Sequence, residues 1–150
     1  MDFSLTKEQK DIQAAAREFA LGEFPDRAQE FDRNETFDLD IWRKACELGF
    51  VGMFIAEEYG GAGLGFFEHS LVTEEFWAVD AGMANAVLTA TFGAELLGLY
   101  GTEEQKKAHL SPLVEGKAIM GTAITEPDAG SDVTGARTTA VREGDEWVIN

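Results

Sequence analysis

The stretch Ala123-Ile124-Thr125-Glu126-Pro127-Asp128-Ala129-Gly130-Ser131-Asp132 lies where this 150-residue chain changes from a helical to an extended sequence pattern. An apolar run of strand length, residues 118–124, leads into it, and small polar residues crowd the turn that follows the proline. Such a loop can lay backbone N–H groups and short hydroxyls against a flat ligand, because little side chain stands in the way. The alternative is an ordinary turn after a strand, in which Pro127 and Gly130 only shape the backbone and bind no ligand.

Strand patterns continue after this loop. Residues 138–142 and 146–150 flank Glu143-Gly144-Asp145, which predicts an antiparallel hairpin with a short glycine-containing turn. A sheet of two or three strands would expose its edges and one apolar face. We therefore expect either that the chain is the N-terminal part of a longer protein or that a partner completes the sheet.

The sequence before the loop has a helical pattern. Thr6-x-x-Gln9 and Thr102-x-x-Gln105 have the form of capping boxes, which mark helix starts. Pro25 ends or kinks the first helix, because proline has no N–H to donate. The apolar spacing predicts helices from Thr6 to about Pro25, from Asp38 to Leu48, from Phe66 to Tyr100 with a break at residues 80–82, and from Thr102 to about Val114.

The expected fold is therefore mainly α. An all-α helical domain occupies residues 1–117, and residues 118–150 form the first strands of an antiparallel β-domain that is incomplete. Within the helical domain, the stretch from Met83 to Leu99 is apolar over most of its surface. We expect it to form one helix at the centre of the domain.

Composition and charge argue against several classes of function. The chain has 28 acidic and 12 basic residues, a net charge of −16, which argues against nucleic acid and anionic membrane surfaces as partners. No apolar run reaches the about 18 residues of a membrane span. The N-terminus resembles neither a secretory signal nor a transit peptide, so we expect a cytoplasmic protein. Two histidines and the single cysteine, Cys46, are not spaced as metal ligands, so no metal site is predicted.

Two further patterns have structural explanations. Residues 60–65 contain four glycines but lack both the G-x-G-x-x-G order of a dinucleotide-binding loop and the Gly-Lys-Ser/Thr of a phosphate-binding loop. A connecting loop is therefore favoured. Glu74 and Glu75 are adjacent, and adjacent helical residues do not face each other, so an exposed acidic face is favoured over an acid–base pair.

Four segments in order resemble the acyl-CoA dehydrogenase family. They are E-E-Y-G-G-A-G at 57–63, Y-G-T-E-E-Q-K at 100–106, T-E-P-D-A-G-S-D at 125–132 and G-D-E-W-V-I-N at 144–150. The resemblance covers the whole chain. It implies an N-terminal helical domain, a middle β-domain and a C-terminal four-helix domain, of which this chain would supply the first and open the second.

The same resemblance implies a flavoprotein oxidoreductase. The family uses FAD to convert an acyl-CoA thioester to a 2-enoyl-CoA, passes the electrons to an electron-transferring flavoprotein, and is usually homotetrameric. Its catalytic base is a glutamate of the C-terminal domain. No catalytic residue is therefore expected in this chain.

The resemblance assigns flavin binding to residues of the 122–131 run: Thr122, Ala123, Ile124, Thr125, Gly130 and Ser131. Thr125 would offer its hydroxyl or backbone to the pyrimidine edge of the flavin, and Ser131 would also face the pantetheine of CoA. Thr122 stands where the family often has an aromatic residue, so stacking on the flavin is not implied there. Asp128 stands where a small residue is frequent, and we expect its carboxylate to point to solvent.

The helix that walls the acyl pocket in the family carries Leu88, Thr91 and Phe92 here. Thr91 either faces the acyl group or donates its hydroxyl to the carbonyl four residues earlier, and the second explanation is favoured. Phe92 would shorten the pocket, which favours short, branched or ring-containing acyl groups.

Two alternative functions stay open. One is an acyl-CoA oxidase-type relative, because access of oxygen to the flavin is not visible in a sequence. The other is a non-catalytic helical interaction module that keeps the scaffold and binds no flavin. The intact loop at residues 125–132 favours the enzymes over the module.

Overall fold

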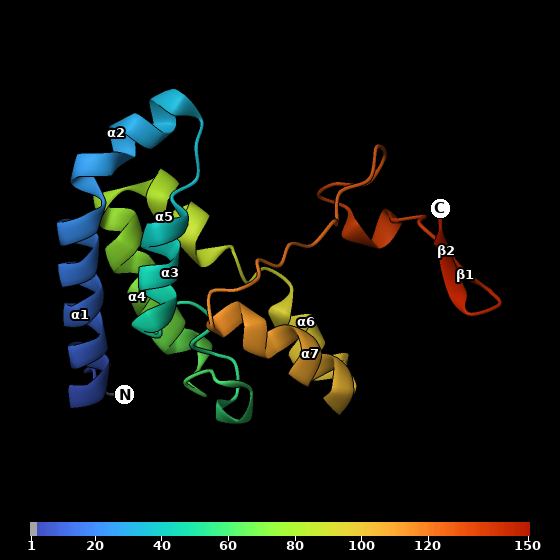
Figure 1. The fold of residues 1–150 in the computed structure, drawn as a ribbon, viewed down its shortest axis with the longest axis horizontal. Helices are drawn as coiled ribbons and strands as arrows, with labels where there is room; N and C mark the ends of the chain where they lie inside the picture. The colour runs from blue at the N-terminus through green and yellow to red at the C-terminus, as the bar shows by residue number, and fades with distance from the viewer. Residues whose placement is uncertain (1–2) are drawn as a thin grey trace.

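The computed structural model describes residues 3–150. A helical body is followed by an antiparallel hairpin that stands apart from it at the C-terminal end (Figure 1). The elements are α1 (Lys7–Glu23), α2 (Pro25–Asn34), α3 (Leu39–Glu47), η1 (Glu57–Tyr59), α4 (Phe66–Val79), α5 (Ala81–Leu88), α6 (Ala94–Tyr100), α7 (Glu103–Val114), η2 (Val133–Gly135), β1 (Ala140–Glu143) and β2 (Glu146–Ile149). The predicted fold class, helices first and antiparallel strands after them, is confirmed.

Helix starts are where the capping signals place them. The Thr6 hydroxyl accepts from the backbone N–H of Gln9 at 3.2 Å, and the Gln9 side chain accepts from the Thr6 N–H at 3.0 Å. Thr102 and Gln105 repeat this pair of bonds at the start of α7. Pro25 is the first residue of α2, a helix that the apolar spacing did not predict, because its residues are mostly polar and none is fully buried.

The main core lies between α1, α3, α4 and α5. Phe76 of α4 is fully buried at its centre. Its ring stacks on Phe19 at a centroid distance of 5.4 Å and meets Phe24 and Phe50 edge-on at 5.3 and 5.4 Å. Such aromatic contacts add to the burial of apolar surface. A second, smaller cluster joins η1, α6 and α7 through Ile55, Tyr59, Ala94, Leu110 and Leu113.

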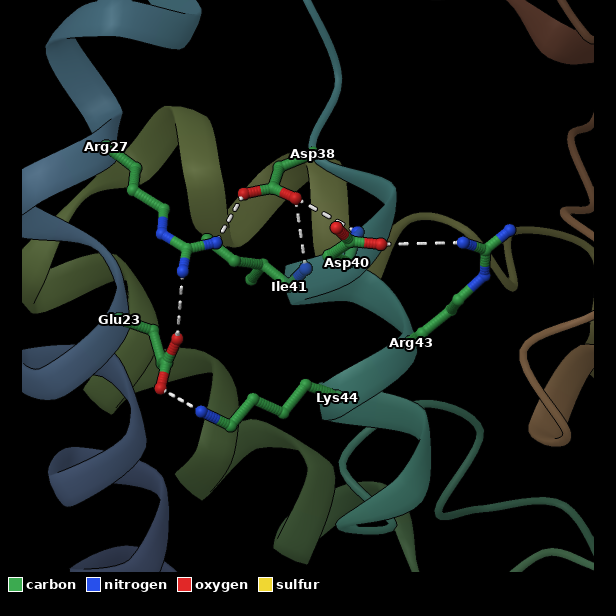
Figure 2. A network of polar contacts seen from close by, with 7 residues as sticks. All are labelled: Glu23, Arg27, Asp38, Asp40, Ile41, Arg43 and Lys44. Atoms are coloured by element: carbon green, nitrogen blue, oxygen red, sulfur yellow. Dashed lines mark hydrogen bonds and ion pairs between the residues drawn. The ribbon is translucent and has the colours of Figure 1, made fainter.

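A polar network holds the corner where α1, α2 and α3 meet (Figure 2). Glu23 at the end of α1 pairs with Lys44 of α3 and, at 4.0 Å, with Arg27 of α2. Arg27 also donates to Asp38 at 3.0 Å, and Asp38 caps α3 by accepting from the N–H of Ile41 at 3.1 Å. One carboxylate therefore both starts α3 and binds it to α2.

The adjacent carboxylates of α4 have different surroundings. Glu74 is exposed, but Glu75 is only 4% exposed, so the expected acidic face is wrong for Glu75. Arg17 of α1 donates its Nε and Nη2 to the Glu75 carboxylate at 2.6 and 2.8 Å. The reason is that α1 packs along α4 (Figure 1), and the Arg17–Glu75 pair lies between the two helices.

The predicted helix from Met83 to Leu99 is in fact two helices. The first, α5, begins at Ala81, two residues before the predicted start, and Asp80 caps it by accepting from the N–H of Met83 at 2.8 Å. The first helix ends at Leu88, and the chain turns through residues 89–93 before α6 begins at Ala94, directly after Gly93, whose φ is 103°. Only the first part is central, while the side chain of Leu99 on α6 is 72% exposed.

The two strand predictions have different outcomes. The hairpin is confirmed: β1 and β2 pair antiparallel from Ala140 opposite Ile149 to Glu143 opposite Glu146, with Gly144 in the turn. The run at 118–124 forms no strand within residues 3–150, because no extended neighbour lies beside it. It makes one isolated bridge, between Met120 and Thr91. The domain boundary at residue 117 stays a prediction.

None of the helices within residues 3–150 combines the length and the apolar character that a membrane span requires.

Candidate functional site

The loop after α7 is held at its start by the turn between α5 and α6. The Thr122 hydroxyl donates to the carbonyl of Phe92 at 2.9 Å, and the Met120 N–H donates to the carbonyl of Ala90 at 2.8 Å. Gly93 makes this approach possible, because a Cβ on it would lie 2.2 Å from Thr122 Oγ1. The Thr122 hydroxyl thus has a structural partner within the chain.

Glu126 fixes the shape of the loop itself. Glu126 and Ala129 exchange backbone hydrogen bonds across Pro127 and Asp128, at 2.9 and 3.3 Å. The Glu126 carboxylate accepts from the N–H groups of Arg137 and Thr138 at 2.7 and 2.8 Å. These bonds keep the pKa of Glu126 below its ordinary value, the Arg137 N–H having the largest effect. Sequence reasoning did not single out this residue.

The other predicted flavin residues line the outside of this turn. Ala123, Ile124, Thr125, Gly130 and Ser131 are all exposed. Among the residues that the structure describes, Thr125, Gly130 and Ser131 find no hydrogen-bond partner. Their N–H groups and hydroxyls are therefore free to bind a ligand. Asp128 is exposed, as expected.

A cavity of about 330 Å³ opens beside the same turn, between α4 and α6. It brings together the three residues predicted for the acyl pocket: Leu88, Thr91 and Phe92. Leu88 and Thr91 are buried, and Phe92 is half exposed. The Thr91 hydroxyl donates to the Leu88 carbonyl at 3.4 Å, three residues earlier and not four, because α5 has already ended.

The sequence reasoning missed the far wall of this cavity. His69, Thr73 and Trp77 of α4 line it, and so does Glu95 of α6. The first three are spaced four residues apart on one helix, which places them on the same face. That spacing was the signal available for finding them.

Two titratable side chains line the cavity, and their surroundings differ. The ring of His69 is edge-on to Phe54 at 5.6 Å, and its Nδ1 is buried without a hydrogen-bond partner among the described residues. Burial lowers the pKa of His69, and the nearby Glu95 carboxylate opposes that effect in part. Burial therefore favours the neutral imidazole. Glu95 accepts from the Gly93 N–H at 3.2 Å, which ties its carboxylate to the turn.

The loop, the cavity and the turn between them can be compared with known proteins. The family model described as acyl-CoA dehydrogenase, N-terminal domain, matches residues 6–117. This chain belongs to the acyl-CoA dehydrogenase family. It is 40% identical, over 152 residues, to a probable acyl-CoA dehydrogenase of Bacillus subtilis (strain 168), a match that spans 100% of this chain and 40% of the relative.

Solved structures of acyl-CoA dehydrogenase relatives share this fold. One is a glutaryl-coenzyme A dehydrogenase in complex with glutaryl-CoA, at 35% identity and a TM-score of 0.90, covering 100% of this chain and 39% of that one. Another is a glutaryl-CoA dehydrogenase from Mycobacterium smegmatis in complex with FADH2, at 31% identity and a TM-score of 0.87, covering 97% and 38%. The chain thus spans about 40% of the length of the curated relatives from Bacillus subtilis and Clostridium acetobutylicum.

Proposed function

We propose that the full-length protein containing this chain catalyses the flavin-dependent α,β-dehydrogenation of an acyl-CoA thioester to a 2-enoyl-CoA. The observation that carries the proposal is the junction at the α5–α6 turn. There, the hydrogen bonds of Met120 and Thr122 hold the candidate flavin loop against the turn that also lines the candidate acyl cavity. A dehydrogenase of this type needs its cofactor and its acyl chain side by side.

The loop residues fit FAD. Thr125, Gly130 and Ser131 present exposed small groups without internal partners, and a Cβ on Gly130 would meet no atom closer than 3.9 Å. We assign them, with Thr122, Ala123 and Ile124, to the cofactor, and Ser131 also to the CoA pantetheine. Thr122 contributes through its backbone, because its hydroxyl is bonded to Phe92. When bound, FAD supplies the acceptor for the hydride that leaves the β-carbon.

The cavity residues fit an acyl chain of limited size. Leu88 and Phe92 supply apolar contact surface, and Thr91 keeps its hydroxyl on the Leu88 carbonyl, so its methyl group is available to the ligand. A volume of about 330 Å³ suits short, branched or alicyclic acyl groups. This part of the chain binds and orients the acyl group, and the base that removes the α-proton belongs to the rest of the protein.

Partners and assembly follow from the family alone. We propose an electron-transferring flavoprotein as the electron acceptor and a homotetramer as the assembled form. The cytoplasmic location expected from the N-terminal sequence stays a prediction. Each is open to direct measurement, by acceptor-dependent turnover, by sedimentation and by fractionation.

The first test is an anaerobic visible spectrum of the full-length protein before and after addition of a panel of acyl-CoA thioesters. Bleaching of the flavin band by a thioester is the expected result. Reoxidation by an electron-transferring flavoprotein and not by oxygen would separate a dehydrogenase from an oxidase. A colourless protein that takes up no added FAD would overturn the proposal and leave the interaction module.

The loop assignment has its own test. Thr125→Val removes one free hydroxyl and should weaken FAD binding by roughly 5- to 10-fold, the effect of one lost hydrogen bond. Thr134→Val is the matched control, because the Thr134 hydroxyl is bonded to Asp132 at 2.6 Å. Equal FAD affinity in the two variants would refute the role of Thr125.

A further inference from the structure

The candidate acyl cavity has a largely apolar lining, but one of its lining residues is a glutamate. Its walls include the aromatic rings of Phe54, Phe66, Trp77 and Phe92. Of the described residues that line it, the only titratable ones are His69 and Glu95, and none is a lysine or an arginine. A ligand carboxylate placed in this cavity would therefore meet a carboxylate and no fixed cation.

The position of Glu95 is fixed by the backbone. Its side chain is partly buried, and Oε2 accepts from the N–H of Gly93 at 3.2 Å. Glu95 cannot turn fully into solvent without giving up that bond.

His69 does not neutralise the negative charge of the Glu95 carboxylate. It is partly buried on α4, its ring edge faces Phe54, and its buried Nδ1 has no hydrogen-bond partner in the described part of the chain. A protonated imidazole carries an N–H on both nitrogens, so the buried Nδ1 would hold an N–H without an acceptor, which is costly. Among the described residues of the cavity lining, Glu95 is therefore an acidic side chain that no cation offsets.

We propose that Glu95 makes the acyl site selective for acyl groups whose distal end carries no negative charge, and that it excludes dicarboxylic acyl groups. This inference rests on the proposed function, because that function assigns the cavity to the acyl chain. It separates this chain from the structurally similar protein that was solved with glutaryl-CoA, whose acyl group ends in a carboxylate. Like charges brought together in a desolvated site repel strongly, while an uncharged acyl group of the same length avoids this repulsion.

The test compares glutaryl-CoA with its terminal methyl ester, which keeps the five-carbon acyl chain and its terminal carbonyl, adds one methyl group and removes the charge. The rate of anaerobic flavin bleaching is measured for both thioesters with the flavin-loaded full-length protein. We expect the ester to react on the order of 100-fold more efficiently than the acid. Glu95→Gln keeps an acceptor for the Gly93 N–H and should shrink this ratio by about tenfold or more.

The matched control is Glu104→Gln on α7. Glu104 is exposed and lies outside the cavity lining, so the change removes the same charge from the whole molecule. The ratio should stay at its original value in this variant. An equal reduction in both variants would assign the selectivity to the net charge of the protein and overturn the role of Glu95.

Two other outcomes would also test the proposed charge selectivity. Equal reaction of acid and ester in the unaltered protein would overturn the charge selectivity while leaving the proposed function intact. A flavin that is bound but bleached by neither compound, nor by any thioester of the wider panel, would overturn the proposed function and this inference with it.

Discussion

Phe76 lies at the centre of the helical core. It is fully buried and contacts three other aromatic rings. Phe76→Ala should lower the free energy of unfolding by about 3–5 kcal/mol, because it leaves a cavity among rings that are held by separate helices. Phe67→Ala on the same helix is the control: Phe67 is 55% exposed, so a change of about 0.5 kcal/mol is expected. Urea unfolding of the two variants measures the difference, and similar costs would contradict the packing described.

Glu126 makes the candidate flavin loop sensitive to pH. Its pKa lies below the ordinary value of 4.5, chiefly because the Arg137 N–H donates to the ionised carboxylate, with Thr138 adding further bonds. The carboxylate therefore contributes its full stabilisation above about pH 4.5 and loses it as the pH falls through the depressed pKa. We expect the amide proton shifts of Arg137 and Thr138 to titrate together below that pH.

The measurement is an NMR pH titration of the unaltered protein and of Glu126→Gln. The glutamine cannot be ionised, so the low-pH titration of both amides should disappear in the variant. A titration that persists in Glu126→Gln would show that another acidic group controls the loop.

At the scale of elements, the α5–α6 turn depends on one glycine. Gly93 has a φ of 103°, and a Cβ there would lie 2.2 Å from the Thr122 hydroxyl. Gly93→Ala should destabilise the protein by at least about 1 kcal/mol through backbone strain alone. Gly98→Ala is the matched control in α6, where a Cβ meets nothing within 4 Å, and it should stabilise by about 0.5–1 kcal/mol. Thermal unfolding of both variants distinguishes the roles, and two changes of the same sign would contradict this account.

The sequence specified helix starts better than helix ends. The starts of α1 and α7 were identified from Thr6 and Thr102, because a capping side chain satisfies N–H groups within its own helix and so leaves a local signal. The end of α5 left no such signal, since apolar residues continue through the turn and Gly93 is one small residue among many. The hydrophobic pattern alone therefore predicted one helix where the structure has two.

The strand prediction at 118–124 failed for a related reason. The run has the composition of a strand, but strands form only where another extended segment supplies hydrogen bonds. Within residues 3–150 its contacts are with the α5–α6 turn instead. In the site, resemblance identified Leu88, Thr91 and Phe92. Glu95 was missed because its place in the cavity depends on where the α5–α6 turn sets α6 relative to α4.

At the scale of the whole molecule, the hairpin has few packing contacts with the rest of the chain. All eight residues of β1 and β2 are exposed, whereas α4 contributes buried residues to the core. A two-stranded hairpin without a covered face is only marginally stable in water. In the 150-residue chain, hairpin amides should exchange with deuterium roughly 100-fold faster than amides of α4, or more.

Hydrogen exchange followed by NMR or mass spectrometry tests this expectation, with the full-length protein as the comparison. The hairpin should gain protection there if its exposed faces are covered by the rest of the sheet. Equal protection of hairpin and α4 in the 150-residue chain would show that the hairpin is stabilised by contacts other than those described.

The hydrogen bonds from Met120 to Ala90 and from Thr122 to Phe92 have a consequence for protein engineering. A designer who reshapes the α5–α6 turn to admit a new acyl group also moves the anchor of the cofactor loop. Substrate preference and cofactor affinity are then not separate design variables in this scaffold. Changes made on α4, across the cavity from the turn, leave that anchor untouched and are the better starting point for altering the substrate.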